Sequence, residues 1–153
     1  MEKKLRINLF GQFNLEHANK SLPSFSKRQD SLLAYLVLHS DQPQQRARLA
    51  FLFWPDSSEK QALTNLRKAI HQLRQVLPDI EQFIDIQSKT LRWHNNESVQ
   101  IDIKDFLNEV EKASRAQQEG YHDTAFQSLA NAVEYYRGDF LPDCYDDWAE
   151  DQR

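Results

Sequence analysis

The stretch NLRKAIHQLRQVL, residues 65–77, decides how this sequence is interpreted. Its apolar residues recur at helical spacing and form one apolar stripe that is expected to be buried. They are Leu66, Ala69, Ile70, Leu73 and Leu77. The opposite side carries bases and amides, and no carboxylate occurs between Glu59 and Asp79. A solvated helix face ordinarily mixes acidic with basic residues, so this composition favours a surface that meets a polyanion over one that only meets water.

The polar residues of this helix and its surroundings suit a DNA groove. Lysine and arginine neutralise phosphates, whereas threonine, glutamine, histidine and lysine can bond base edges in the major groove. The candidate groove-facing residues are Thr64, Lys68, His71, Gln72 and Gln75. The candidate phosphate contacts are Arg46, Arg48, Lys60, Arg67, Arg74, Lys89 and Arg92.

The segments around this helix predict its fold. Ser58 and Gln61 form a capping box that opens a helix over 58–77. Two helices are predicted before it, over 26–39 and 44–54, with Pro55 ending the second. The tight WPDSS turn that follows makes a helix-turn-helix candidate.

Alternating segments flank the three helices. Leu5, Ile7 and Leu9 alternate with polar residues, which predicts a short antiparallel sheet. Residues 83–93 predict a β-hairpin in which Ile84 and Ile86 match Leu91 and Trp93 across a tip near Ser88 and Lys89. The predicted fold is therefore an α+β winged helix-turn-helix with an N-terminal antiparallel sheet and a C-terminal hairpin wing.

The last third of the sequence predicts a pair of helices. Small residues recur where a tetratricopeptide unit lets its two helices approach: Ala113, Gly120, Ala125 and Ala132. Larger apolar residues are expected to line the pair: Phe106, Leu107, Val110, Leu129 and Val133. We therefore expect a winged-helix DNA-binding domain over 1–97, followed over 98–153 by the start of an all-α tetratricopeptide-like segment, which the family resemblance given below makes an activator domain. A single unit cannot bury both faces, so the sequence is expected to be a fragment of a longer protein.

The uneven distribution of charge along the sequence indicates two modules with different partners. The 153-residue chain has a net charge of −4, but residues 1–78 hold 12 basic and 6 acidic residues, a balance of +6, which leaves −10 for the rest. No apolar run approaches the ~18–20 residues of a membrane span, and no secretory signal is evident. Together with the single cysteine, this predicts a cytoplasmic protein.

No pattern in the sequence indicates an enzyme. The three glycines are isolated, so there is no phosphate-binding loop, and the five histidines lack metal-ligand spacing. The acidic residues over 143–151 lack the glycine-turned loop of an EF-hand, and the predicted role of this segment is a solvated helix start. We expect no cofactor and no metal.

Taken together, five stretches of the sequence resemble, in order, the SARP-type bacterial transcriptional activators. They are LRINLFGQFNL (5–15), LLAYLVLHSDQPQQRARLAFLFWPD (32–56), NLRKAIHQLRQVL (65–77), IDIKDF (101–106) and YYRGDFLPDCYDDWAEDQR (135–153). That family pairs an OmpR/PhoB-like winged helix with a bacterial transcriptional activator domain of tetratricopeptide-like helices.

The resemblance implies a sequence-specific regulator of transcription, an activator, that reads double-stranded DNA with the helix 58–77. The hairpin 83–93 would be the wing, although its QSKT tip lacks the glycine that family wings often carry. RNA polymerase or another regulatory protein would contact the acidic helices, and a homodimer on DNA stays open. The alternative is a protein–protein adaptor in which the helical segment is the working surface and the winged helix is only a scaffold.

Overall fold

The computed structural model of the chain describes residues 5–11, 13–17, 20–22, 27–77, 79–94, 99–141 and 146–152. Helices and small sheets alternate along it, as expected for the predicted α+β class. The chain forms two compact units, one of residues 1–22 with 97–153 and the other of residues 23–96. The predicted boundary at residue 97 between a DNA-binding and an activator domain stays a prediction.

The first unit is built on a four-stranded sheet that joins distant parts of the sequence. Its strands are β1 (Leu5–Asn8), β2 (Asn14–His17), β3 (Lys20–Ser21) and β7 (Val99–Ile101). They lie in the order β3-β2-β1-β7. β1 pairs with β2 as the predicted antiparallel ribbon, and it also pairs in parallel with β7, which was not predicted. The alternating apolar residues of β1 are completely buried.

A buried carboxylate ties this sheet to the next helix. Asp102 begins α4 (Asp102–Gln118) directly after β7. Its two carboxylate oxygens accept the backbone N–H groups of Leu9, at 2.9 and 3.0 Å, and of Phe10, at 2.9 Å. The N–H of Ile103 donates to the same carboxylate at 2.7 Å. The side chain therefore links the end of β1 to the first turn of α4.

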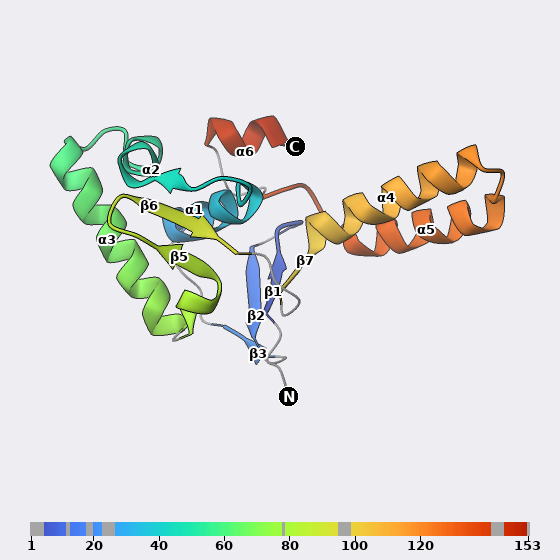
Figure 1. Ribbon diagram of the computed structural model, residues 1–153, viewed down its shortest axis with the longest axis horizontal. Helices are drawn as coiled ribbons and strands as arrows, with labels where there is room; N and C mark the ends of the chain where they lie inside the picture. The colour runs from blue at the N-terminus through green and yellow to red at the C-terminus, as the bar shows by residue number, and fades with distance from the viewer. Residues whose placement is uncertain are drawn as a thin grey trace. The chain divides into compact units, whose positions relative to one another are not determined.

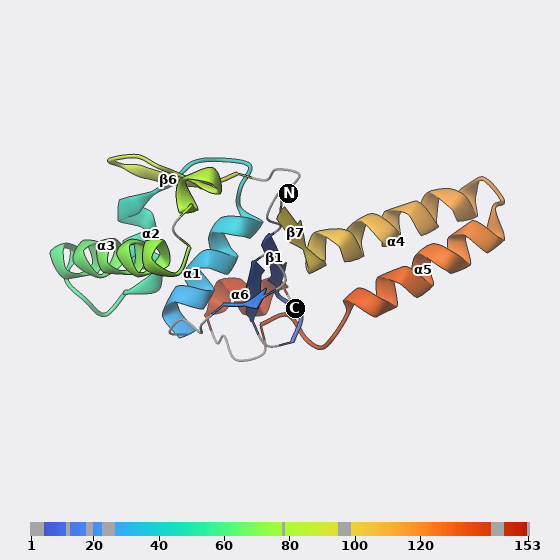
Figure 2. The same cartoon turned by 90° about the horizontal axis from the view of Figure 1, so that it is seen from below.

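The predicted helix pair is present. α4 and α5 (His122–Tyr135) lie side by side and run antiparallel (Figure 1, Figure 2). Gly120 makes the turn at a φ of +82°, where a side chain would be strained. The predicted small residues Ala113, Ala125 and Ala132 are buried. A short helix, α6 (Asp147–Gln152), begins in the acidic segment, as predicted.

One prediction about these helices is wrong. Leu107, Val110, Leu129 and Val133 were expected to line the pair, but all four are exposed, with Val133 at 71%. A two-helix hairpin has a single inner seam, and here alanines fill it so that the backbones can approach. The larger apolar side chains therefore project from the outside of the pair.

The second unit carries the helix quoted at the outset. Its helices are α1 (Lys27–Leu38), α2 (Arg46–Phe53) and α3 (Glu59–Val76), followed by a 3₁₀ turn at Ile80–Gln82. Its strands are β4 (Gln44–Gln45), β5 (Ile84–Ile86) and β6 (Thr90–Trp93), in the order β4-β6-β5. α3 runs alongside the β5–β6 hairpin (Figure 1).

The hairpin has the predicted register. Ile84 pairs with Trp93, and Ile86 pairs with Leu91. Trp93 is almost fully buried and stacks on Phe83 with 5.8 Å between the ring centroids. The alternating pattern fixes this register because a slip of one residue would turn the buried side chains toward solvent.

Candidate nucleic-acid interface

The face that α3 exposes is set by the stripe that it buries. Ser58 caps the helix, since its hydroxyl accepts the backbone N–H of Gln61 at 3.2 Å. The buried residues of α3 are Ala62, Leu66, Ala69, Ile70 and Leu73, which confirms the predicted helix phase. The opposite side of the helix is consequently held outward.

Most of the predicted groove-facing side chains are on this outward side. Lys68, His71, Gln72 and Gln75 are exposed, and the His71 and Gln75 side chains approach to 3.3 Å between their Nε2 atoms. Thr64 is half-buried, and its hydroxyl donates to the Lys60 carbonyl at 3.0 Å. The first four can thus reach a ligand freely, whereas the Thr64 hydroxyl already has a partner within the helix.

Three of the predicted phosphate contacts meet in one cavity. Arg46, at the start of α2, lies with Arg67 and Arg74 of α3 around a cavity of about 300 Å³. His71 and two isoleucines, Ile70 and Ile86, complete the lining. The backbone N–H of Arg46 donates to the carbonyl of Lys89 at 2.9 Å, which fixes Arg46 against the hairpin tip.

The electrostatics of this arginine cluster, Arg46, Arg67 and Arg74, favour an anion. Burial lowers the pKa of the Arg46 guanidinium, and repulsion from Arg74 and Arg67 lowers it further. The buried Nε of Arg46 has no hydrogen-bond partner among the described residues. Arg74 pairs with Glu81, with 3.2 Å between Nε and Oε1. Three cations held this close gain from any negative charge that enters the cavity.

The remaining predicted phosphate contacts do not line the cavity. Arg48, Lys60 and Lys89 are exposed elsewhere on the same unit. Arg92 is half-buried, and its guanidinium donates to the carbonyls of Ser40 and Asp41, both at 3.1 Å. Arg92 therefore already supports the loop between α1 and β4.

The sequence alone missed the convergence of the arginine cluster and the role of Glu81. Arg67, His71 and Arg74 are spaced at i, i+4 and i+7, which places them on one stripe of a helix. That signal could have grouped these three residues. The position of Arg46 depends on the pairing of β4 with β6, which no local pattern shows.

The structure offers no metal centre in the part of the chain that it describes, since no group of three histidine, cysteine or acidic residues could hold an ion there. Cys144 and the first acidic residue of its segment, Asp143, lie outside the described residues. No described helix is long and apolar enough to cross a membrane.

Comparison with known proteins identifies one domain and several relatives. Residues 101–153 match the family model of the bacterial transcriptional activator domain. Over 143 residues the chain is 25% identical to the transcriptional regulatory protein MoaR1 of Mycobacterium bovis and of Mycobacterium tuberculosis. These alignments cover 91% of this chain and 46% of each relative. The chain thus spans less than half the length of the curated relatives that it matches.

A solved structure has a similar fold. The structure of Mycobacterium tuberculosis EmbR in complex with a low-affinity phosphopeptide superposes with a TM-score of 0.85 at 22% sequence identity. The match covers 98% of this chain and 41% of the EmbR chain. These matches confirm the resemblance to SARP-type activators. The matched curated relatives are described as regulators, not as enzymes.

Proposed function

We propose that this relative of bacterial transcription regulators binds double-stranded DNA sequence-specifically and activates transcription. In this proposal the second unit works as a winged helix, with α3 in the major groove and the β5–β6 hairpin as the wing. Strands, three helices and a hairpin follow one another in the order that such a fold requires. As a bacterial DNA-binding protein, it would act in the cytoplasm.

The observation that carries this proposal is the arginine cluster beside the outward face of α3. Duplex DNA presents one negative charge per ~1.7 Å of its axis, so a helix in the groove always has phosphates beside it. One phosphate in the cavity would offset the repulsion among Arg46, Arg67 and Arg74 and give the Arg46 Nε an acceptor. Arg48, Lys60 and Lys89 would contact phosphates further along the backbone.

Base recognition is assigned to the exposed polar stripe of α3. Lys68, His71, Gln72 and Gln75 project from the side opposite the buried stripe, so they can reach base edges without disturbing the core. Thr64 keeps the predicted groove position, but it would have to exchange its bond to the Lys60 carbonyl for one to DNA.

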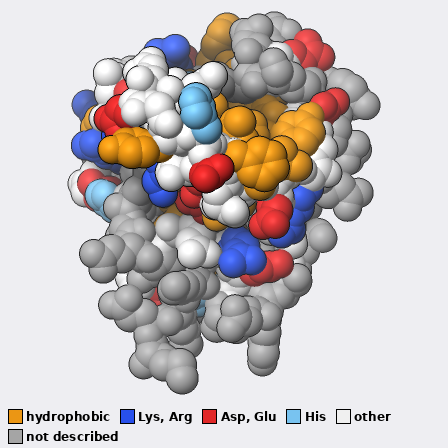
Figure 3. Space-filling view, turned by 90° about the vertical axis from the view of Figure 1, so that its right-hand side faces the viewer, with side chains coloured by type: hydrophobic (Ala, Val, Ile, Leu, Met, Phe, Trp, Pro, Cys, Tyr) orange, Lys and Arg blue, Asp and Glu red, His pale blue; other side chains and the backbone are white. Residues whose placement is uncertain are grey.

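A second function is favoured by the outer surface of α4 and α5. Phe126, Leu129 and Val133 are spaced at i, i+3 and i+7 and are 74%, 50% and 71% exposed. Figure 3 shows hydrophobic side chains gathered on the side of the molecule where these helices lie. An exposed apolar patch of this kind typically marks a protein contact. We propose that this surface meets RNA polymerase, another regulatory protein or a second copy of the chain on DNA.

DNA binding by the full chain tests the first function. A pool of random duplexes is bound and sequenced, and affinity for a selected site and a scrambled site is then measured by fluorescence anisotropy at two salt concentrations. Binding should weaken steeply with salt, with a log–log slope near −0.9 per phosphate contact. A salt-independent affinity, or no binding, would leave the adaptor function as the better explanation.

Two alanine variants test the assignment of α3. Lys68→Ala should weaken binding to both duplexes and reduce the salt slope by about one, whereas His71→Ala should cost ~1–3 kcal/mol mainly at one position of the selected site. Lys112→Ala is the control, because this exposed lysine lies on α4. If both α3 variants bind like the control, the face of α3 is only solvated.

A further inference from the structure

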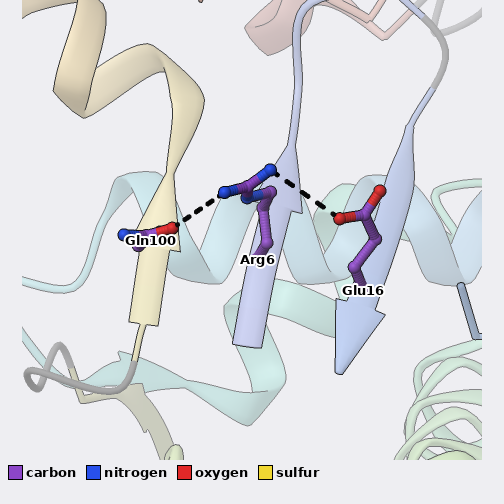
Figure 4. A network of polar contacts seen from close by, with 3 residues as sticks. All are labelled: Arg6, Glu16 and Gln100. Carbon is purple, nitrogen blue, oxygen red and sulfur yellow. Dashed lines mark hydrogen bonds and ion pairs between the residues drawn. The ribbon is translucent and has the colours of Figure 1, made fainter. Parts of the chain in front are cut away.

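A second cavity, separate from the arginine cluster, lies within the first unit. It has a volume of about 140 Å³ and is lined by β1, β7, the first turn of α4 and the end of α5. Arg6 is one of its lining residues, and the Arg6 guanidinium donates to Gln100 at 3.3 Å and lies 3.9 Å from Glu16. Figure 4 shows these three side chains in a row across three neighbouring strands, so Arg6 is held in place from both sides.

The lining of this cavity contains a buried amide that lacks a partner. Asn8 is only 4% exposed, and its Nδ2 has no hydrogen-bond partner among the described residues. Buried amide donors in proteins are nearly always bonded to protein, water or a ligand. A molecule with an acceptor oxygen in the cavity would satisfy this donor.

The charges around the cavity balance. Arg6 and Arg137 supply two positive charges, and Asp102 and Asp105 supply two negative ones. The Asp102 oxygens are already occupied by three backbone N–H groups. Burial raises the pKa of the Asp105 carboxyl, and the Arg6 charge only partly offsets this shift, so a cationic group beside Asp105 would stabilise its carboxylate. A simple anion would be repelled by the two carboxylates and a simple cation by the two guanidinium groups. A ligand that carries both charges suits this lining.

We propose that the cavity binds a small zwitterion of the α-amino-acid type. Its carboxylate would accept from Asn8 Nδ2 and from Arg137, and its ammonium would donate to Asp105. The volume is close to the ~150 Å³ of a cavity that holds benzene, so the ligand has roughly six non-hydrogen atoms. Asp102 links the end of the strand that carries Asn8 to the first turn of α4. A ligand in the cavity would therefore stabilise the contact between this strand and α4, which lies in the segment that matches the activator-domain family.

Calorimetry and ¹⁵N NMR on the full chain test this inference, with L-alanine as the probe. L-alanine should bind saturably and shift the side-chain amide signal of Asn8. Propionate lacks the ammonium group and isopropylamine lacks the carboxylate, so both should bind at least about tenfold more weakly, which is ~1.4 kcal/mol. Equal binding of propionate would show an anion site instead and would overturn the proposal.

Two variants of exposed or half-exposed residues locate the site. Arg137→Gln and Asp105→Asn should each weaken L-alanine binding about tenfold while the melting temperature stays close to that of the parent. Arg115→Gln, on the exposed surface of α4, is the matched control and should bind normally. If L-alanine shifts no signal, or if the variants bind like the control, the partner of Asn8 is water only and the proposal fails.

Discussion

Removing the carboxylate beside the arginine cluster should strengthen DNA binding. Glu81 pairs with Arg74 at 3.2 Å, and the side chains are 61% and 47% exposed, so the pair itself contributes only ~0–1 kcal/mol to stability. Glu81→Gln releases Arg74 to contact a phosphate. We therefore expect affinity to rise by up to about fivefold, which corresponds to ~1 kcal/mol. The salt slope should steepen by up to about 0.9, which is one additional phosphate contact.

The assay compares this variant with one of identical charge. Glu111 forms an exposed pair with Arg115 on α4 at 4.0 Å, so Glu111→Gln changes the net charge equally without touching the arginine cluster. Fluorescence anisotropy over a series of salt concentrations gives both the affinity and the slope. Equal gains for the two variants would mean that only net charge matters, and the role given to Arg74 would be refuted.

Three further predictions concern the second unit. Leu66 is fully buried, so Leu66→Ala should lower the free energy of unfolding by ~2–5 kcal/mol, and an unchanged denaturation midpoint would contradict the packing of α3. Burial raises the pKa of Asp30 to about 7. Between about pH 4 and pH 7 the folded state therefore binds more protons at this carboxyl than the unfolded chain, and stability should fall as pH rises; Asp30→Asn should flatten that fall in thermal melts. Arg92→Ala should lower the melting temperature because two carbonyls lose a charged donor, whereas Lys89→Ala should lower only DNA affinity; the reverse result would exchange their roles.

Much of the fold could be predicted from the local periodicity of apolar residues. The hairpin register was predicted from the alternation of apolar residues in its two strands, because only one pairing places Ile84, Ile86, Leu91 and Trp93 on the same face of the sheet. The exposed face of α3 could be predicted in the same way, as the side opposite its buried apolar stripe. Both features depend on residues that are neighbours in the sequence, which is why a single sequence was enough.

Contacts between distant segments could not be predicted in this way. The parallel pairing of β1 with β7 joins Ile7 to Ile101, and nothing in either strand specifies the other. The position of Arg46 in the arginine cluster likewise depends on the tertiary structure. In α4 and α5, helical spacing showed which apolar residues share a stripe but not whether a neighbour covers that stripe, so Leu129 and Val133 were wrongly expected inside.

The parallel pairing of β1 with β7 also orders events during synthesis. About 90 residues separate Ile7 from Ile101, and a ribosome adding ~5–20 residues per second needs roughly 5–20 s to make them. Throughout that time β1 cannot pair with β7, and the backbone N–H groups of Leu9 and Phe10 cannot yet donate to the Asp102 carboxylate. The helices and hairpin of residues 23–96 contact mainly one another and can fold in the meantime. The nascent chain should therefore gain its arginine cluster before it gains a finished first sheet.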